Sequence, residues 1–248
     1  MVWRVVRGEW RVKLMAARFL ILETSHASGW TALAEGSRIV ARRRLEEARR
    51  HARDLVPATA ELLAELGWRA RDLNGVIVSV GPGSYTGLRV GLMSAKTLAY
   101  ASGAALLGVE TFRAIAVQAP TVEVAVVADA QQGKIYAQTF DLRAESPVTA
   151  VPGLSAAAPL SIQLAADWVK SCPPTAFITG PGVELVRGLL PAEQPFASGE
   201  LRLSSPESLL ALGLARFQAG ERDDPFTLEP LYLRASSAEE LWVARGNK

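Results

Sequence analysis

The passage of a buried-strand pattern directly into a glycine-rich loop constrains the fold of this chain more than any other feature. Residues 76–80 read Val-Ile-Val-Ser-Val, and residues 81–87 read Gly-Pro-Gly-Ser-Tyr-Thr-Gly. A near-continuous apolar run predicts a strand covered on both faces, and apolar residues at helical spacing after the loop predict a helix that ends near Gly103. The helical stripe comprises Leu88, Leu92, Ala95, Leu98 and Ala99. The pattern therefore predicts a strand–loop–helix unit of an α/β protein.

The loop itself has two interpretations. Glycine permits positive φ and close backbone approach, and a helix N-terminus presents free N–H groups that attract anions. The loop is therefore either a cradle for the phosphates of ATP or ADP, or a tight turn that holds no ligand. The candidate residues for nucleotide binding or for contact with a partner are Gly81, Gly83, Ser84, Tyr85, Thr86, Gly87 and Arg89.

The loop departs from the motifs of three enzyme classes. In a serine hydrolase the nucleophile occupies the middle of G-x-S-x-G, whereas Ser84 directly follows Gly83. No lysine and hydroxyl pair closes the loop, as a Walker A motif requires. Gly87 comes one residue late for the G-x-G-x-x-G of dinucleotide-binding proteins. These departures disfavour all three classes.

Composition limits the other function classes. The 248 residues carry a formal charge of +2, and the chain has one cysteine, which suits a reducing compartment. The run Arg42-Arg43-Arg44 is followed by Glu46 and Glu47, so it predicts an ion-paired, solvated face more than a track for nucleic-acid phosphates. No apolar run reaches the 18 residues that a membrane span needs. We expect a cytoplasmic protein that does not enter the membrane and does not bind RNA alone.

The rest of the chain alternates between strand and helix patterns. Three short strands separated by Ser/Gly turns predict a meander. In the helix predicted after this meander, Pro57 interrupts the pattern and predicts a kink or a second N-terminus. A second unit begins near Thr121, with the least ordered connection at 141–160. The expected strands are 19–23, 30–34, 38–43, 105–109, 123–129, 134–140 and 175–179, and the expected helices are 46–66, a segment from Thr111, 162–170, 183–190 and 206–218.

Several of these segments, in their order along the chain, resemble the TsaB (YeaZ) family. Residues 81–89 are similar to its G-P-G-[ST]-[FY]-T-G-[LV]-R signature, and residues 229–234 to its E-P-x-Y-L-R tail. Weaker matches are Leu20–Ser25 to L-A-I-D-T-S, His51–Leu66 to H-x-x-x-L-x-P…L, 108–112 to G-V-[ST]-T, and 129–137 to D-A-R-x-G-E-V-Y. The resemblance covers roughly residues 18–240.

The resemblance implies a two-lobed α/β fold of the actin/Hsp70/sugar-kinase-like (ASKHA) superfamily, with mixed sheets flanked by helices. Residues 18–118 are then expected to form the N-terminal lobe, with the glycine loop and the partner-binding helices. Residues 119–248 are expected to form the C-terminal lobe. Residues 1–17 precede the usual family start and are expected to be an extension of doubtful order.

The resemblance also implies a function. A TsaB-like protein is a non-catalytic scaffold for a TsaD-like transferase, supported by a TsaE-like ATPase, in threonylcarbamoylation of the adenosine next to the anticodon of tRNAs that read A-starting codons. Contact with tRNA is expected only through the complex, ATP or ADP is a candidate ligand at the partner interface, and a homodimer is expected when the chain is alone. The expected interface residues are His51, Leu55, Leu62 and Leu66, with Leu55 at the centre.

The sequence offers few candidates for catalytic or metal-binding residues. The two histidines, His26 and His51, do not form the H-x-x-x-H pair of TsaD-like relatives, so we expect no metal and no catalytic residue. Glu23 stands where the family usually has aspartate, and Gln131 replaces its arginine, which argues against independent nucleotide turnover. Glu23, Thr24, Ser25 and Asp129 are a secondary candidate site, although each carboxylate is equally suited to capping a strand-end turn. The alternatives are an autonomous ATPase or small-molecule kinase of the same superfamily and, with little support, a glycoprotease.

Overall fold

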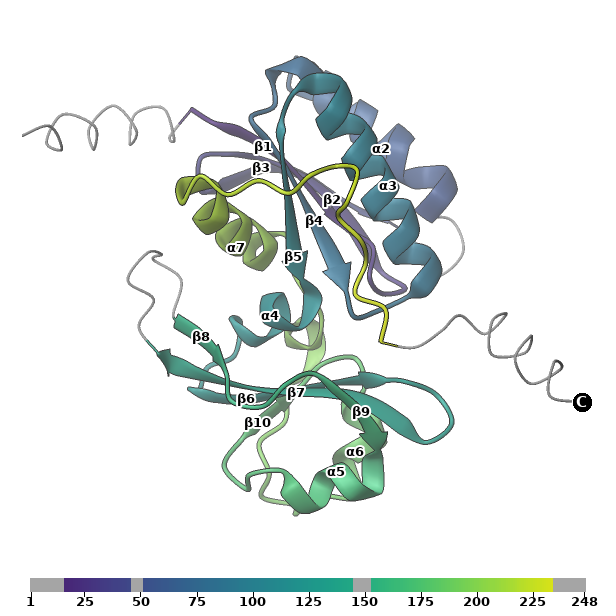
Figure 1. Cartoon of the computed structure of the whole chain (residues 1–248), viewed down its shortest axis with the longest axis vertical. Helices are drawn as coiled ribbons and strands as arrows, with labels where there is room; N and C mark the ends of the chain where they lie inside the picture. Colours follow the sequence, from purple (N-terminus) through teal and green to yellow (C-terminus); the bar gives the residue numbers. More distant parts are fainter. Residues whose placement is uncertain (1–15, 46–50, 145–152, 234–248) are drawn as a thin grey trace, which may run out of the picture.

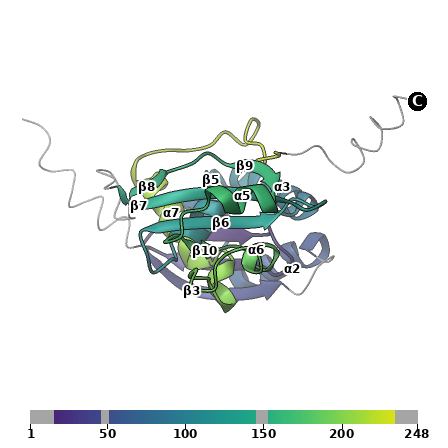
Figure 2. The same cartoon turned by 90° about the horizontal axis from the view of Figure 1, so that it is seen from below.

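The computed structural model describes residues 16–45, 51–144 and 153–233 of the chain. Two lobes, each built on a five-stranded sheet, lie one above the other (Figure 1). Seen from the side of the second lobe, its sheet lies across the near end of the molecule (Figure 2). This arrangement confirms the expected two-lobed α/β fold with mixed sheets flanked by helices.

The first sheet has the order β3-β2-β1-β4-β5. The first three strands form an antiparallel meander, as predicted, and β4 and β5 continue the sheet in parallel with β1. Every residue of β4 is buried, because helices cover both faces of the sheet. The strands are β1 (Arg18–Glu23), β2 (Gly29–Glu35), β3 (Arg38–Leu45), β4 (Gly75–Gly81) and β5 (Ala105–Glu110).

Helices α2 (His51–Glu65) and α3 (Tyr85–Ser102) cover one face of this sheet, and α7 (Pro206–Gln218) covers the other (Figure 1). Helix α3 ends at Ser102, as predicted from the glycine that follows, and Gly103 caps it with a left-handed φ of 75°. Helix α2 runs through Pro57 without interruption, so the prediction of a second N-terminus there is wrong. The predicted start of this helix, residues 46–50, lies outside the described residues.

The second sheet pairs β6 with β7 in an antiparallel hairpin, and the intervening Gln131, Gln132 and Gly133 all have positive φ. The predicted helix at 162–170 begins too early: residues 161–164 pair with β7 as a strand, and the helix starts at Ala165. A short helix, α4, lies between the lobes (Figure 1). The elements are β6 (Glu123–Asp129), β7 (Lys134–Ala144), β8 (Gly153–Ala156), β9 (Ser161–Leu164), β10 (Phe177–Thr179), α4 (Thr111–Ala116), α5 (Ala165–Ser171) and α6 (Val183–Arg187).

The structure corrects both expected domain boundaries. Helix α7 packs Leu209, Leu210 and Leu214 into the core of the first sheet, so the chain returns to the first lobe instead of staying in a C-terminal lobe of residues 119–248. At the other end, Ala17 is buried in the same core and its carbonyl accepts a hydrogen bond from the Gly36 amide at 2.8 Å. The expected extension at residues 1–17 is therefore too long by at least this residue, and residues 1–15 lie outside the described part.

The segment that follows α7 also belongs to the first lobe. Asp223 forms a bridge to the edge strand β5, with its amide donating to the Leu106 carbonyl at 2.9 Å. The chain then runs back along α3, from the end of the helix to its start (Figure 1). The contacts, in that order, are Phe226 with Tyr100, Leu228 with Lys96, and Tyr232 with Tyr85 and Arg89.

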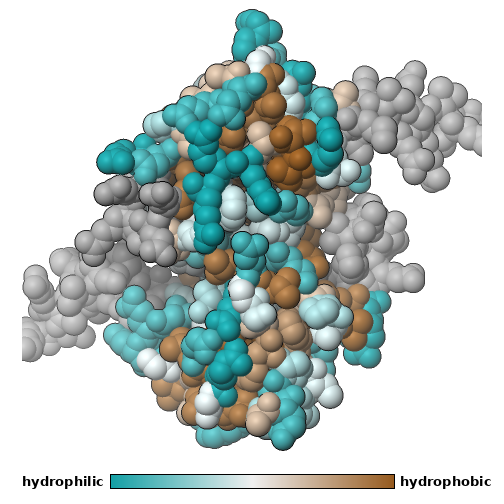
Figure 3. Space-filling view, turned by 180° about the vertical axis from the view of Figure 1, so that it is seen from behind, coloured by the Kyte–Doolittle hydropathy of each residue, from teal (hydrophilic) through white to brown (hydrophobic). Residues whose placement is uncertain are grey.

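The surface offers little continuous apolar area on the face opposite this tail. Figure 3 shows that face, where hydrophobic residues occur as separate small patches among hydrophilic ones. Within the residues that the structure describes, no helix combines the length and apolar character that crossing a membrane requires.

Candidate functional site

The end of β1 and the glycine loop are packed backbone against backbone. A Cβ atom at Gly83 would lie 2.3 Å from the Ser25 carbonyl oxygen, and one at Gly87 would lie 2.0 Å from the Thr24 carbonyl oxygen. The Ser84 amide donates to the Ser25 carbonyl at 2.6 Å. Only glycine fits at these two positions, so the close approach of β1 accounts for them without a ligand.

The start of α3 is capped by its own residues. The Ser84 hydroxyl accepts a hydrogen bond from the Gly87 amide at 3.2 Å, and the Ser84 carbonyl accepts one from the Leu88 amide at 2.8 Å. Gly81 has a φ of 106° and precedes a cis peptide bond to Pro82. Two of the N–H groups that a phosphate would use, those of Ser84 and Gly87, therefore already donate to the Ser25 carbonyl and the Ser84 hydroxyl.

The glycine loop also contacts the segment that follows α7, through Tyr232. The ring of Tyr85 stacks against Tyr232 with 4.7 Å between centroids, and the Arg89 guanidinium lies 4.3 Å from the centroid of the Tyr85 ring. The Arg89 Nε donates to the Tyr232 hydroxyl at 3.0 Å. Ser84 and Thr86 remain exposed. Sequence reasoning matched the tail motif but did not predict that it lies on the glycine loop.

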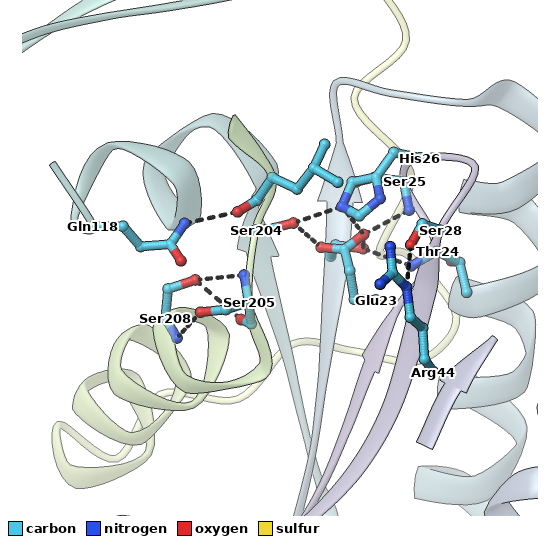
Figure 4. A network of polar contacts seen from close by, with 12 residues as sticks. Glu23, Thr24, Ser25, His26, Ser28, Arg44, Gln118, Ser204, Ser205 and Ser208 are labelled. Atoms are coloured by element: carbon cyan, nitrogen blue, oxygen red, sulfur yellow. Dashed lines mark hydrogen bonds and ion pairs between the residues drawn. The ribbon is translucent and has the colours of Figure 1, made fainter. Parts of the chain in front are cut away.

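Glu23 is fully buried at the end of β1, and both oxygens of its carboxylate accept hydrogen bonds (Figure 4). The Oε1 atom accepts from the Ser25 amide at 2.6 Å and from the Ser79 hydroxyl at 3.0 Å. The Oε2 atom accepts from the Ser204 hydroxyl, which belongs to the segment that leads from the second lobe into α7. The carboxylate caps its own turn, as one interpretation of the sequence predicts, and it also joins three separate parts of the chain.

His26 and Ser204 lie beside Glu23 but do not form a serine-hydrolase triad. The His26 Nε2 atom is 3.3 Å from the Ser204 hydroxyl and 4.0 Å from the Glu23 Oε1 atom. In a triad, the carboxylate holds one ring nitrogen while the other nitrogen takes the serine proton. Here both neighbours face the same nitrogen, and the serine proton is directed to the carboxylate. The three side chains therefore lack the serine–histidine–carboxylate order that a hydrolase triad requires.

The rest of the secondary candidate site is Asp129 in the second lobe and Thr24 and Ser25 next to Glu23 in the first. Asp129 is exposed at the end of β6, where its Oδ1 atom accepts from the Gln131 amide at 2.6 Å and caps the hairpin turn. Thr24 and Ser25 are buried, and their hydroxyl oxygens have no hydrogen-bond partner among the described residues. The Thr24 hydroxyl instead faces Gly91, where a Cβ would lie only 2.1 Å away. Among the described residues, no group of three or more His, Cys, Asp and Glu side chains is arranged to hold a metal ion.

The expected interface on α2 is wrong for two of its four residues. Leu55 and Leu62 are 1% and 2% exposed and pack into the core between α2, α3 and the first sheet. The apolar stripe that the sequence shows is therefore the inward face of the helix. Leu66 is partly buried against the same core, and the side chain of His51 lies outside the described part.

The outward face of the two helices carries other apolar side chains. Val56 on α2 is 58% exposed and Met93 on α3 is 60% exposed. On α2, Ala60 and Ala64 are also exposed and follow Val56 at intervals of four residues, so the three share one side of the helix. This second apolar side of α2 could have been found from the sequence, because Val56, Ala60 and Ala64 form an i, i+4, i+8 series beside the leucine stripe.

Comparisons with known proteins agree with this architecture. The family model of TsaD, tRNA N6-adenosine threonylcarbamoyltransferase, matches residues 44–154. The tRNA threonylcarbamoyladenosine biosynthesis protein TsaB of Bacillus subtilis is 24% identical, with 90% of this chain and 97% of that protein covered. The protein of the same name from Escherichia coli is 26% identical, with 77% and 83% covered.

A solved structure supports the fold. YeaZ from Pseudomonas aeruginosa superposes with a TM-score of 0.74 at 23% identity, and the match covers 88% of this chain and 100% of that chain. The likeness extends over both lobes, since the match includes nearly the whole described chain. With the glycine-loop signature, the tail motif and relatives of nearly full length in agreement, this chain belongs to the TsaB (YeaZ) family.

Proposed function

We propose that this protein is a non-catalytic subunit that works with a TsaD-like transferase and a TsaE-like ATPase to form threonylcarbamoyladenosine next to the anticodon of tRNAs that read A-starting codons. The observation that carries the proposal is family membership through relatives that are matched over most of their length and are named as threonylcarbamoyladenosine biosynthesis proteins. Such a role implies a cytoplasmic location, where tRNA is available.

Contacts of the candidate residues in both lobes support a non-catalytic role. Glu23 uses both carboxylate oxygens on its own chain, and Gly83 and Gly87 accommodate the end of β1. Asp129 holds its own hairpin turn. The residues that a nucleotide-hydrolysing relative would use therefore have structural roles here, which supports a scaffold over an autonomous kinase.

The outward face of α2 and α3 is the proposed surface for the TsaD-like partner, in place of the leucines that the sequence indicated. We define this surface by Val56, Ala60, Ala64 and Met93. Small side chains allow a partner helix to approach closely, and exposed Val and Met side chains supply apolar area to bury. A homodimer through the same face is the proposed state of the isolated chain.

Contact with tRNA is proposed to occur only through the complex. Arg42 is paired with Glu207 at 2.9 Å, and Arg43 is paired with Glu61 and Glu65 on α2. These ion pairs supply the negative charges that would otherwise be provided by phosphates, and the near-neutral total charge supports the same view.

The test is reconstitution with purified TsaD-like and TsaE-like proteins, the threonylcarbamoyl-adenylate donor and tRNA. A Val56→Asp variant should lose complex formation by at least about tenfold, because the complex would bury an unpaired carboxylate, and tRNA modification should fall with it. The matched control is Val122→Asp, since Val122 is 46% exposed on the second lobe and should tolerate the same change without effect.

The outcomes separate the parts of the proposal. Normal binding by a folded Val56→Asp variant would show that the partner uses another face. Modification of tRNA by this protein without a TsaD-like protein would overturn the non-catalytic role. ATP hydrolysis by the isolated chain, well above that of a Glu23→Gln/Asp129→Asn variant, would instead favour the kinase-like alternative.

A further inference from the structure

The two lobes are joined by two chain segments, which lie next to each other between the lobes and share a hydrogen bond. The first runs from the end of α4 to the start of β6, and the second runs through Leu203 and Ser204 into α7. The Gln118 side-chain amide, on the first segment, donates to the Leu203 carbonyl, on the second, at 2.8 Å (Figure 4). The two connections are thus bonded to each other at the junction between the lobes.

The second connection is held on both sides of Ser204. Beyond it, Ser205 caps α7 through reciprocal bonds with Ser208 at 3.1 and 3.2 Å. Helix α7 is fixed on the first sheet, because a Cβ at Gly213 would lie 2.6 Å from Ile77. Before it, the Thr179 hydroxyl of the second sheet donates to the Leu201 carbonyl at 2.7 Å. The connection is therefore anchored to a rigid element in each lobe.

Glu23 bonds to this connection at its centre. Its Oε2 atom accepts from the buried Ser204 hydroxyl, while its Oε1 atom stays bonded to the Ser25 amide and the Ser79 hydroxyl in the first lobe. A hydrogen bond to a buried carboxylate is among the stronger ones in proteins. An aspartate would be shorter by one methylene, so it could not keep the Ser25 contact and also reach Ser204.

We infer that the Glu23 carboxylate fixes the angle between the lobes, without any bound ligand, by its bond to Ser204. We call the two connections, residues 117–122 and 201–205, the hinge. The carboxylate lies at the end of β1, at the junction between the lobes, and it bonds to the hinge itself. The protein would thereby keep one lobe arrangement whether or not a nucleotide is present. This inference does not depend on the partner surface on α2 and α3.

The test is amide hydrogen exchange of the full chain, followed in peptides that contain residues 117–122 and 201–205. Ser204→Ala removes the hydroxyl donor and should raise exchange in these peptides about ten- to a hundredfold. Ser79→Ala is the matched control, because it removes a hydrogen bond to the same carboxylate, and one from the Thr24 amide, without touching the connection into α7. It should leave exchange in these peptides unchanged. Ser204→Thr keeps the hydroxyl and should restore the slow exchange.

Two further comparisons complete the experiment. Glu23→Asp should reproduce the Ser204→Ala pattern, and adding Mg²⁺ with ADP to the unmodified protein should leave hinge exchange unchanged. Equal effects of Ser204→Ala and Ser79→Ala, unchanged hinge exchange in Ser204→Ala, or strong protection of the hinge by ADP would each overturn the inference. If Ser204→Ala fails to fold, the Glu23→Asp and Ser204→Thr variants decide by the same measurement.

Discussion

Replacing Gly87 with alanine tests whether the glycine loop is built for internal packing. Alanine in a helix is ordinarily more favourable than glycine by about 0.8–1.0 kcal/mol. At Gly87, however, the new Cβ would lie 2.0 Å from the Thr24 carbonyl oxygen, whereas ordinary contact begins at 3.4 Å. Helix α3 and the end of β1 would have to separate by more than an ångström.

The cost of that separation exceeds the gain in helix propensity. Overpacking a close contact typically costs about 1–3 kcal/mol, and here both sides are backbone, which cannot rotate away as a side chain can. The movement would also strain the turn that Glu23 caps through the Ser25 amide. With a cost at the top of that range, about 3 kcal/mol, and a gain of about 1 kcal/mol, we expect a net loss of about 2 kcal/mol in the free energy of unfolding, or roughly 4–8 °C in melting temperature for a chain of this size.

Urea unfolding followed by far-ultraviolet circular dichroism measures the difference. The control is Gly188→Ala at the end of α6, where the backbone is helical and no atom lies within 4 Å of the new Cβ. This control should be neutral or slightly stabilising. A Gly87→Ala variant as stable as the unmodified protein would refute the packing explanation, and it would reopen the phosphate-cradle interpretation of the loop.

Two further predictions concern other parts of the chain. Asp223→Ala removes the acceptor of the Gly108 amide and of Arg216, at 2.6 and 2.8 Å, and should lower the free energy of unfolding in urea by about 2 kcal/mol. Asp141→Ala, at an exposed pair with Arg143, should lower it clearly less. Equal losses would contradict the role assigned to the Asp223 carboxylate. Burial, and secondarily Glu123, raises the pKa of Cys172 from 9.0 to about 11, so its thiolate is scarcer in the folded protein. Iodoacetamide should label the native thiol at pH 8 about a hundredfold more slowly than in urea, with the rate rising about tenfold per pH unit up to that pKa, and similar rates at pH 8 would contradict it.

Local patterns in the sequence predicted much of the architecture. The strand–loop–helix unit at 75–102 and helix α7 were predictable because their periodicity, caps and glycine stop are all local signals. The β9 strand was missed because its four residues become a strand only by pairing with β7. The domain boundary was misplaced because nothing local indicates that α7 returns to the first sheet.

The candidate site was predictable as a set of residues but not as a set of contacts. A phosphate cradle and a close backbone crossing both require glycine, so composition alone cannot distinguish them. The distinction depends on Thr24, which is far from Gly87 in the sequence. The leucine stripe on α2 predicted a buried face correctly but could not tell whether that face meets its own sheet or a partner. Burial in the folded chain assigns Leu55 and Leu62 to the sheet.

The end of β1 explains why these features occur together. Two successive carbonyls, of Thr24 and Ser25, lie against the glycine loop, and the preceding carboxylate of Glu23 bonds to the hinge. The same three-residue stretch thereby fixes the start of α3 and the connection into α7. A longer acidic side chain at position 23 and glycines at 83 and 87 are then two separate requirements of one packing arrangement. Restoring aspartate at 23 alone would release the hinge without freeing the loop, because the backbone contacts of Gly83 and Gly87 do not depend on that side chain.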